Sequence, residues 1–127
     1  MLPFVKPIDV KRYFPDKEIE SYNDAIKSIM EKEKLNEKEV NILMSHQFVT
    51  SGLNNPETCE SETINVGGSE NVDVSNFDKF DYVALGHIHK KDYSTKENQK
   101  IVYPGSVVSL GFDELGEHGV IVGDIEK

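Results

Sequence analysis

Residues 80–89 read Phe-Asp-Tyr-Val-Ala-Leu-Gly-His-Ile-His, a short apolar run that ends in a glycine and two histidines. An apolar run of this length, bounded by polar residues, is too short for a helix and suits a buried β-strand. Residues 40–45, Val-Asn-Ile-Leu-Met-Ser, form a second such run, and His46 follows it directly. We therefore expect strands at 82–86 and 40–45, each followed by histidine at its carboxyl end.

The histidines after these strands are candidate metal ligands. Strand carboxyl ends in layered α/β folds are where binding sites usually form. Residues i and i+2 of an extended segment point the same way, so His87 and His89 are expected to reach one volume. Gly86 gives the backbone room to turn just before them. Neutral imidazole is the commonest transition-metal ligand, although a lone histidine such as His46 is more often a hydrogen-bonded core or surface residue.

Residues 21–34 are predicted to form the main helix. Ser21 followed by Asp24 resembles a capping box at the start of this helix. One side of the helix carries an apolar stripe at i, i+3, i+4, i+7 and i+8, formed by Tyr22, Ala25, Ile26, Ile29 and Met30. The opposite side is charged, so we expect the stripe to pack onto a sheet.

The remaining segments predict a fold of the α/β class, with one main helix packed on a mostly β core. Residues 51–62, which include Cys59, have the polar composition of a loop, and Gly67-Gly68-Ser69 marks a turn. The other expected elements are an extended segment at 2–8, a helical turn at 75–80, a polar excursion at 90–99, a strand at 101–103, and a hairpin of weaker strands at 107–110 and 118–123. Several sheet edges would be open in such a fold.

Composition sets the class of protein. The chain has 127 residues, of which 37% are hydrophobic and 29% charged, as in ordinary globular proteins. No apolar run has the length that crossing a bilayer requires, and residues 1–7 lack the pattern of a signal peptide. Cys59 is the single cysteine, so it forms no internal disulfide, and a cytoplasmic location is the default expectation.

The net charge limits what the chain binds by itself. Its formal charge is −9, and no basic stripe is present. Affinity for nucleic acid comes mostly from Lys and Arg neutralising phosphates. If the chain acts on DNA, metal ions or a partner chain must therefore supply positive charge. His118, which lies in a polar stretch, is expected at the surface.

Three stretches together resemble one family. They are Ser45-His46-Gln47-Phe48, the segment 80–89, and Tyr103-Pro104-Gly105-Ser106. In this order they are similar to the calcineurin-like metallophosphoesterases, and within them to the SbcD nuclease subunits. The resemblance covers almost the whole chain. It implies that residues 1–127 are the C-terminal half of a catalytic domain, a partial β-sandwich with no separate second domain.

The resemblance also implies a metal site and partners. Family members hold two divalent ions, usually manganese, about 3.5–4 Å apart. His46 and His87 match ligands of one ion, and His89 matches a ligand of the other. Gly86, Gly105 and Ser106 match supporting positions around these ligands. The complete protein would cut DNA with an SbcC-like ATPase partner, in repair and recombination.

Departures from the family pattern leave this chain with an incomplete ligand set. The family's Asp-x-His and Gly-Asn-His elements are absent from the sequence, and Gly123-Asp124 follows the last expected strand. The resemblance therefore implies no catalytic residue in this chain, and we expect it to be inactive alone. Three alternatives stay open: another calcineurin-like phosphoesterase acting on nucleotides or phosphoproteins, a small histidine metal-binding protein, and an assembly module. An assembly module would pair its open edges with another chain or a second copy, by domain exchange in the latter case.

Overall fold

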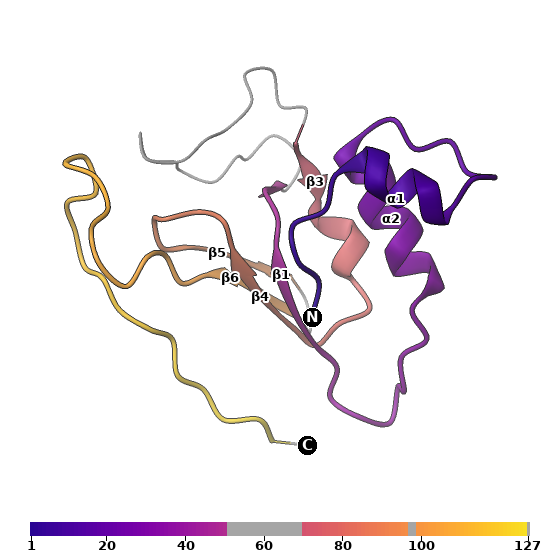
Figure 1. The fold of residues 1–127 in the computed structure, drawn as a ribbon. Helices are drawn as coiled ribbons and strands as arrows, with labels where there is room; N and C mark the ends of the chain where they lie inside the picture. The colour runs from indigo at the N-terminus through magenta and orange to yellow at the C-terminus, as the bar shows by residue number, and fades with distance from the viewer. Residues whose placement is uncertain (51–69, 97–98, 127) are drawn as a thin grey trace.

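A four-stranded sheet with the strand order β1-β4-β6-β5 forms the centre of the fold (Figure 1). The computed structural model describes residues 1–50, 70–96 and 99–126, so the predicted loop at 51–62, Cys59 and the turn at 67–69 lie outside the described residues. The strands are β1 (Ile42–His46), β4 (Tyr82–Gly86), β6 (Gln99–Tyr103) and β5 (Asp92–Lys96). The first three are parallel and β5 is antiparallel to β6, so three carboxyl ends meet at one edge of the sheet.

The pairing of β1 with β4 fixes which residues meet at that edge. Ile42 lies opposite Tyr82, and His46 lies opposite Gly86. Two hydrogen bonds set this register at the amino ends of the strands. The Asn41 backbone N–H donates to the Asp81 carboxylate at 2.7 Å, and the Asp81 backbone N–H donates to the Asn41 carbonyl at 2.9 Å.

The N-terminal segment extends the sheet beyond β1. The Leu2 backbone N–H donates to the Met44 carbonyl at 2.8 Å, and the His46 N–H donates to the Leu2 carbonyl at 3.2 Å. Leu2 thus forms a parallel bridge with Ser45. The chain then continues past the carboxyl end of β1, which places Phe4 beside the histidines described below.

Helices cover one face of the sheet (Figure 1). They are α1 (Pro7–Tyr13), α2 (Tyr22–Lys32) and the 3-10 helix η1 (Val74–Phe77). A short parallel pair, β2 (Val49–Thr50) and β3 (Val72–Asp73), lies beside α2.

The capping box of α2 forms as predicted. The Asp24 N–H donates to the Ser21 hydroxyl and the Ser21 N–H donates to the Asp24 carboxylate, both at 3.0 Å. These bonds from Ser21 lower the pKa of Asp24. At the other end of α2, the Lys79 ammonium donates to the carbonyls of Met30 and Glu33, which suits the negative end of the helix dipole.

Alternate residues of the strands face the helices and form the core. In β1 and β4 the buried positions alternate with more exposed ones, as expected of a sheet covered on one face. Apolar residues from the sheet and from the helices join in one cluster, which includes Leu43, Val83, Leu85 and Ile101 from the strands and Ile26, Met30 and Phe77 from the helices.

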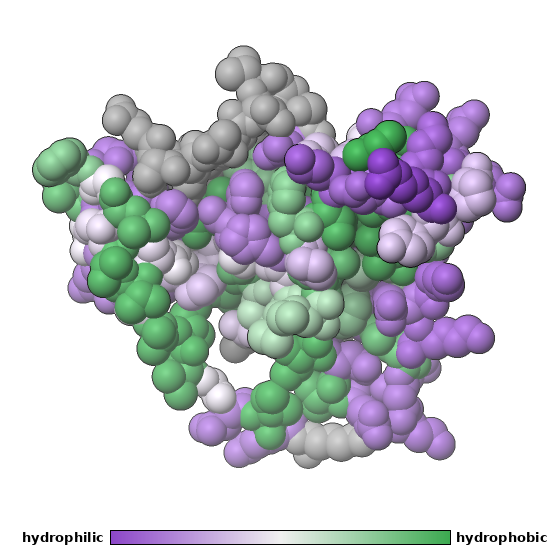
Figure 2. Space-filling model, in the orientation of Figure 1, coloured by the Kyte–Doolittle hydropathy of each residue, from purple (hydrophilic) through white to green (hydrophobic). Residues whose placement is uncertain are grey.

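The opposite face of β1 and the C-terminal segment expose apolar side chains. Ile42 and Met44 are 40% and 53% exposed on the face away from α2. Figure 2 shows a further run of apolar side chains along the segment that follows β6. Its exposed members are Val107, Val108, Leu110, Phe112, Leu115, Val120, Ile121, Val122 and Ile125.

The α/β class is confirmed, and the single helix-covered sheet is consistent with the partial sandwich that the resemblance implies. The main helix, the strands at 82–86 and 101–103, and the helical turn near residue 75 are also confirmed. Among the described helices, none combines the length and apolarity that crossing a bilayer requires.

Three predictions of local structure are wrong. The segment 2–8 is extended only in part, because Pro7 occupies the first turn of α1, where a missing N–H costs nothing. The polar segment 90–99 contains β5, whose backbone pairs with β6. The predicted hairpin at 107–110 and 118–123 is absent from the described segment 104–126, where backbone and side-chain hydrogen bonds hold the loop instead.

The hydroxyl of Tyr103 holds the chain just after β1. It accepts a hydrogen bond from the Val49 N–H at 2.6 Å and donates one to the Gln47 carbonyl at 2.7 Å. Tyr103 and Val49 are buried and Gln47 is fully buried, so no water replaces these bonds readily. This hydroxyl therefore links the end of β6 to the turn that follows His46.

The Tyr103→Phe substitution tests this link. It leaves a backbone N–H and a carbonyl without their partner in the core, and we expect a loss of about 2 kcal/mol in the free energy of unfolding. Urea denaturation measures the loss. Tyr82→Phe, for which the described part of the chain shows no side-chain hydrogen bond, is the matched control and should change stability little. Equal stability of the two variants would contradict the role of the Tyr103 hydroxyl.

Candidate functional site

The side chains of His46 and His87 meet at the carboxyl edge of the sheet. Their ring centroids are 5.4 Å apart, with the planes at 88°. Gly86 makes this approach possible, because a Cβ at that position would lie 2.7 Å from Nδ1 of His46. Strand pairing and a glycine thus bring together two of the three predicted ligands.

Aromatic rings surround the imidazole of His87. Phe4 stacks on it with centroids 5.8 Å apart and planes within 2°, and Phe48 meets it edge-on at 6.2 Å. Tyr22 packs against Phe4 with their centroids 5.6 Å apart, and burial, followed by the nearby Glu70 carboxylate, raises the pKa of Tyr22. The ring of His87 therefore has little freedom to rotate.

The backbone at His87 is strained. Its φ is 102°, and no other residue except glycine has positive φ in the described part of the chain. A side chain makes this conformation costly, and such strain is concentrated at functional sites. The turn also ends β4, so the extended geometry expected to align His87 with His89 is absent.

His89 contacts a different set of residues. Its Nδ1 lies 2.9 Å from Oε1 of Glu114, which comes from the loop after β6. The structure therefore places the three predicted ligands as a pair, His46 with His87, and a separate His89. Within residues 1–50, 70–96 and 99–126, no three His, Cys, Asp or Glu side chains gather as a metal-binding group.

The predicted supporting residues Gly105 and Ser106 touch the main chain of His89. Gly105 has φ of 82°, and a Cβ there would lie 2.6 Å from the His89 carbonyl oxygen. Only glycine suits both the conformation and the close approach. The backbone N–H of Ser106 donates to the same carbonyl at 2.8 Å. The Pro-Gly-Ser loop thus fixes the position of His89.

An open pocket of about 280 Å³ lies beside His89. Its lining includes Lys90, Lys91, Ser106, Glu114 and Glu117. The two lysines therefore lie next to a predicted ligand, in a pocket that also holds two carboxylates. The lysines supply the kind of charge that attracts phosphate groups, and the carboxylates oppose it.

These residues fit the nitrogen part of a metal centre. Two imidazoles face each other, and His89 has a carboxylate on Nδ1, an arrangement common behind metal-bound histidine. Carboxylate ligands for His46 and His87 are not found among the described residues. Among the described residues, the ligand set is therefore partial.

Sequence reasoning missed the residues that surround the ligands. Glu114 falls in a stretch predicted to be a turn, yet its side chain is only 1% exposed. Phe4 falls in a segment predicted to be a simple strand. Local sequence patterns do not predict the contacts of either residue, because each reaches the site from a separate part of the chain.

Comparison with known proteins relates the chain to a nuclease subunit. No model of a known protein family matches the chain. The chain is 36% identical over 130 residues to SbcD of the SbcCD nuclease from Staphylococcus epidermidis. This chain is a relative of SbcD. The alignment covers 99% of the chain and 33% of that SbcD protein, so the chain spans about a third of the length of the curated relative.

The strain at His87 gives a first prediction for the site. In ordinary conformations alanine is more stable than glycine, but at positive φ the order reverses. We expect His87→Gly to unfold with a free energy about 1 kcal/mol higher than His87→Ala. Chemical denaturation of the two variants measures the difference, and both lose the same imidazole. Greater stability of the alanine variant would show that the backbone at residue 87 is not strained.

The raised pKa of His118 gives a second prediction for the site. The carbonyls of Glu114 and Ser106 accept hydrogen bonds from its two ring nitrogens, each at 3.0 Å, and raise its pKa above the ordinary 6.5. Only the doubly protonated ring donates to both carbonyls. The stability from these bonds is therefore fully present below the unfolded pKa and is lost as pH rises through the folded pKa.

We expect the stability difference between the native chain and His118→Gln to be larger at about pH 5.5 than at about pH 8.5. Denaturation at both pH values measures it, and an NMR titration of the His118 ring should show a midpoint above 6.5. A midpoint at or below that value would refute this explanation.

Proposed function

We propose that residues 1–127 form the C-terminal half of a metallophosphoesterase domain in a cytoplasmic nuclease subunit of the SbcD type. The complete protein would hydrolyse DNA phosphodiester bonds with two divalent metal ions, such as Mn²⁺. It would do so with an SbcC-like ATPase, in repair and recombination. The observation that carries this proposal is the meeting of His46 and His87 at adjacent strand ends, in a chain related to SbcD.

In this proposal His46 and His87 hold one ion and His89 holds the other. Such ions activate water and stabilise charge on the attacked phosphorus centre and the leaving oxygen. Gly86 leaves the space that the His46 ring occupies, and the aromatic rings around His87 restrict its orientation. Preorganised ligands of this kind hold their geometry without help from the ion.

The negative charge of the chain supports a requirement for other sources of positive charge in DNA binding. A formal charge of −9 opposes the approach of DNA, and beside His89 the lysines at residues 90 and 91 share their pocket with the carboxylates of Glu114 and Glu117. Most of the positive charge that meets the phosphate backbone would therefore come from the metal ions and the partner subunit.

Titration of the isotope-labelled chain with Mn²⁺, followed by NMR, tests the ligand assignment. Paramagnetic broadening should be strongest at the ring signals of His46, His87 and His89. The double variant His46→Ala/His87→Ala should bind Mn²⁺ more weakly, with its remaining broadening strongest at His89. Broadening confined to surface carboxylates, with the histidine signals unchanged, would contradict the assignment.

A nuclease assay tests the partial character of the site. With Mn²⁺ present, the purified chain alone should not degrade linear duplex DNA, because the Asp-x-His and Gly-Asn-His elements of the family are absent from its sequence. Robust metal-dependent degradation by this chain would reject the proposal that its site is partial.

An assembly role is the second candidate. The exposed side chains of Ile42 and Met44, and the apolar segment 107–125, favour packing against another chain or a second copy. Light scattering of the sample used for the Mn²⁺ titration separates this role from the first. A strictly monomeric, well-folded chain would count against assembly with itself.

A further inference from the structure

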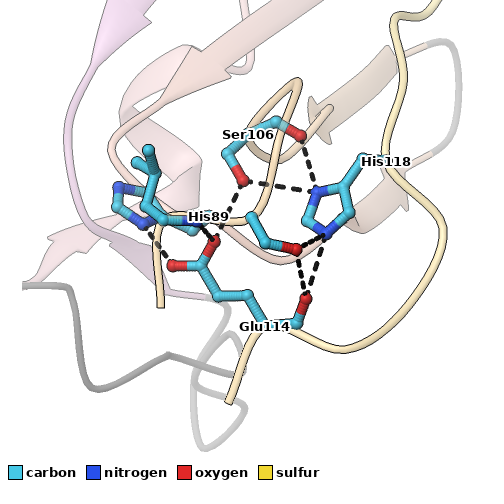
Figure 3. A network of polar contacts seen from close by, with 6 residues as sticks. His89, Ser106, Glu114 and His118 are labelled. Atoms are coloured by element: carbon cyan, nitrogen blue, oxygen red, sulfur yellow. Dashed lines mark hydrogen bonds and ion pairs between the residues drawn. The ribbon is translucent and has the colours of Figure 1, made fainter. Parts of the chain in front are cut away.

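A buried carboxylate lies behind His89. Glu114 is 3% exposed, and its side chain is joined to three hydrogen-bonding groups of the same region (Figure 3). Burying a carboxylate is costly unless donors surround it. The position of Glu114 is therefore determined by the groups that contact it.

Two of these groups fix the orientation of the carboxylate. The Leu110 backbone N–H donates to Oε2 at 2.8 Å, and the Ser106 hydroxyl donates to the same oxygen at 3.3 Å. Oε1 is thereby turned toward Nδ1 of His89, 2.9 Å away. An ionised carboxylate only accepts hydrogen bonds, so a proton shared between an ionised Glu114 and His89 would lie on Nδ1.

The main chain of Glu114 is held as firmly as its side chain. Its carbonyl accepts hydrogen bonds from the Ser109 hydroxyl at 2.8 Å and from Nε2 of His118 at 3.0 Å. Its N–H donates to the Gly111 carbonyl at 3.2 Å. The loop after β6 thus presents the carboxylate as a rigid acceptor.

The same loop holds the main chain of His89. Ser106 donates its N–H to the His89 carbonyl, and Gly105 packs against that carbonyl at a distance that excludes a side chain. Both ends of the bond between His89 and Glu114 are therefore fixed by residues 105–114. In the neutral ring, a proton held on Nδ1 leaves the lone pair on Nε2.

We propose that Glu114 is a positioning residue that holds His89 as the Nδ1–H tautomer and directs its Nε2 lone pair toward a metal ion. The identity of the ion rests on the proposed function, whereas the tautomer is a property of the chain alone.

The tautomer can be measured without metal. Long-range ¹H–¹⁵N correlation spectra at about pH 8.5, where imidazole side chains are ordinarily neutral, should show His89 with the proton on Nδ1. Glu114→Gln retains the shape of the side chain but has one acceptor oxygen for the two N–H donors of His89 and Leu110. We expect this variant to lose the tautomer preference, giving a mixture of both forms.

Glu126→Gln is the matched control, because it makes the same change of charge at an exposed position outside the pocket beside His89. The control should keep the Nδ1–H tautomer. If His89 of the native chain carries its proton on Nε2, the inference is wrong. This measurement needs no variant, so the inference can be tested even if Glu114→Gln does not fold. An unchanged tautomer in a folded Glu114→Gln chain overturns it as well.

Mn²⁺ titration of the same three proteins separates the two proposals. We expect Glu114→Gln to weaken Mn²⁺ binding at His89 by about 10- to 100-fold, with His46 and His87 unaffected. If the native tautomer depends on Glu114 but Mn²⁺ leaves the His89 signals unchanged, the positioning role stands and the metal assignment of His89 fails. If Mn²⁺ binds at His89 equally well in both chains and the tautomer is the same, the positioning role fails and the metal assignment stands.

Discussion

The parallel pairing of β1 with β4 is the constraint on which the candidate site depends. It aligns His46 with Gly86. Because Gly86 has no side chain, it leaves room for the His46 ring at the end of the neighbouring strand. The next residue, His87, then turns into the same edge at the expense of a positive φ. Because the register is also fixed by Asn41 and Asp81 at the opposite ends of the strands, the two histidines meet as a consequence of strand pairing.

The sequence predicted those parts of the fold that depend on local patterns. The apolar run before His87 and the apolar stripe of α2 are continuous signals, and both elements are found where expected. β5 was missed because its residues are polar and its partner, β6, supplies the pairing. The N-terminal segment was misread past Pro7, since proline in a first helical turn looks the same as proline in an extended segment.

The candidate ligands could be named from the sequence, whereas the residues around them could not. His46, His87 and His89 stand out because each follows an apolar strand signal. Glu114 lies 25 residues beyond His89 and Phe4 lies far before it, so their contacts depend on the path of the chain in three dimensions. His87 and His89 were expected to point together because an extended backbone through residue 87 would align them. The structure has a turn there instead.

The candidate site has two parts of unequal stability. The first is the pair His46 and His87, and the second is His89 with the loop after β6. His46 and His87 lie at strand ends whose opening breaks the sheet and the core, so their arrangement should persist until the whole chain unfolds. His89 depends on a loop in which side chains form most of the bonds and neighbouring apolar residues are exposed. Opening such a loop disrupts fewer buried apolar contacts than opening the sheet, so it requires less free energy. The arrangement of His46 and His87 therefore depends on the folding of the whole chain, whereas the position of His89 depends on the bonds made by residues 105–114.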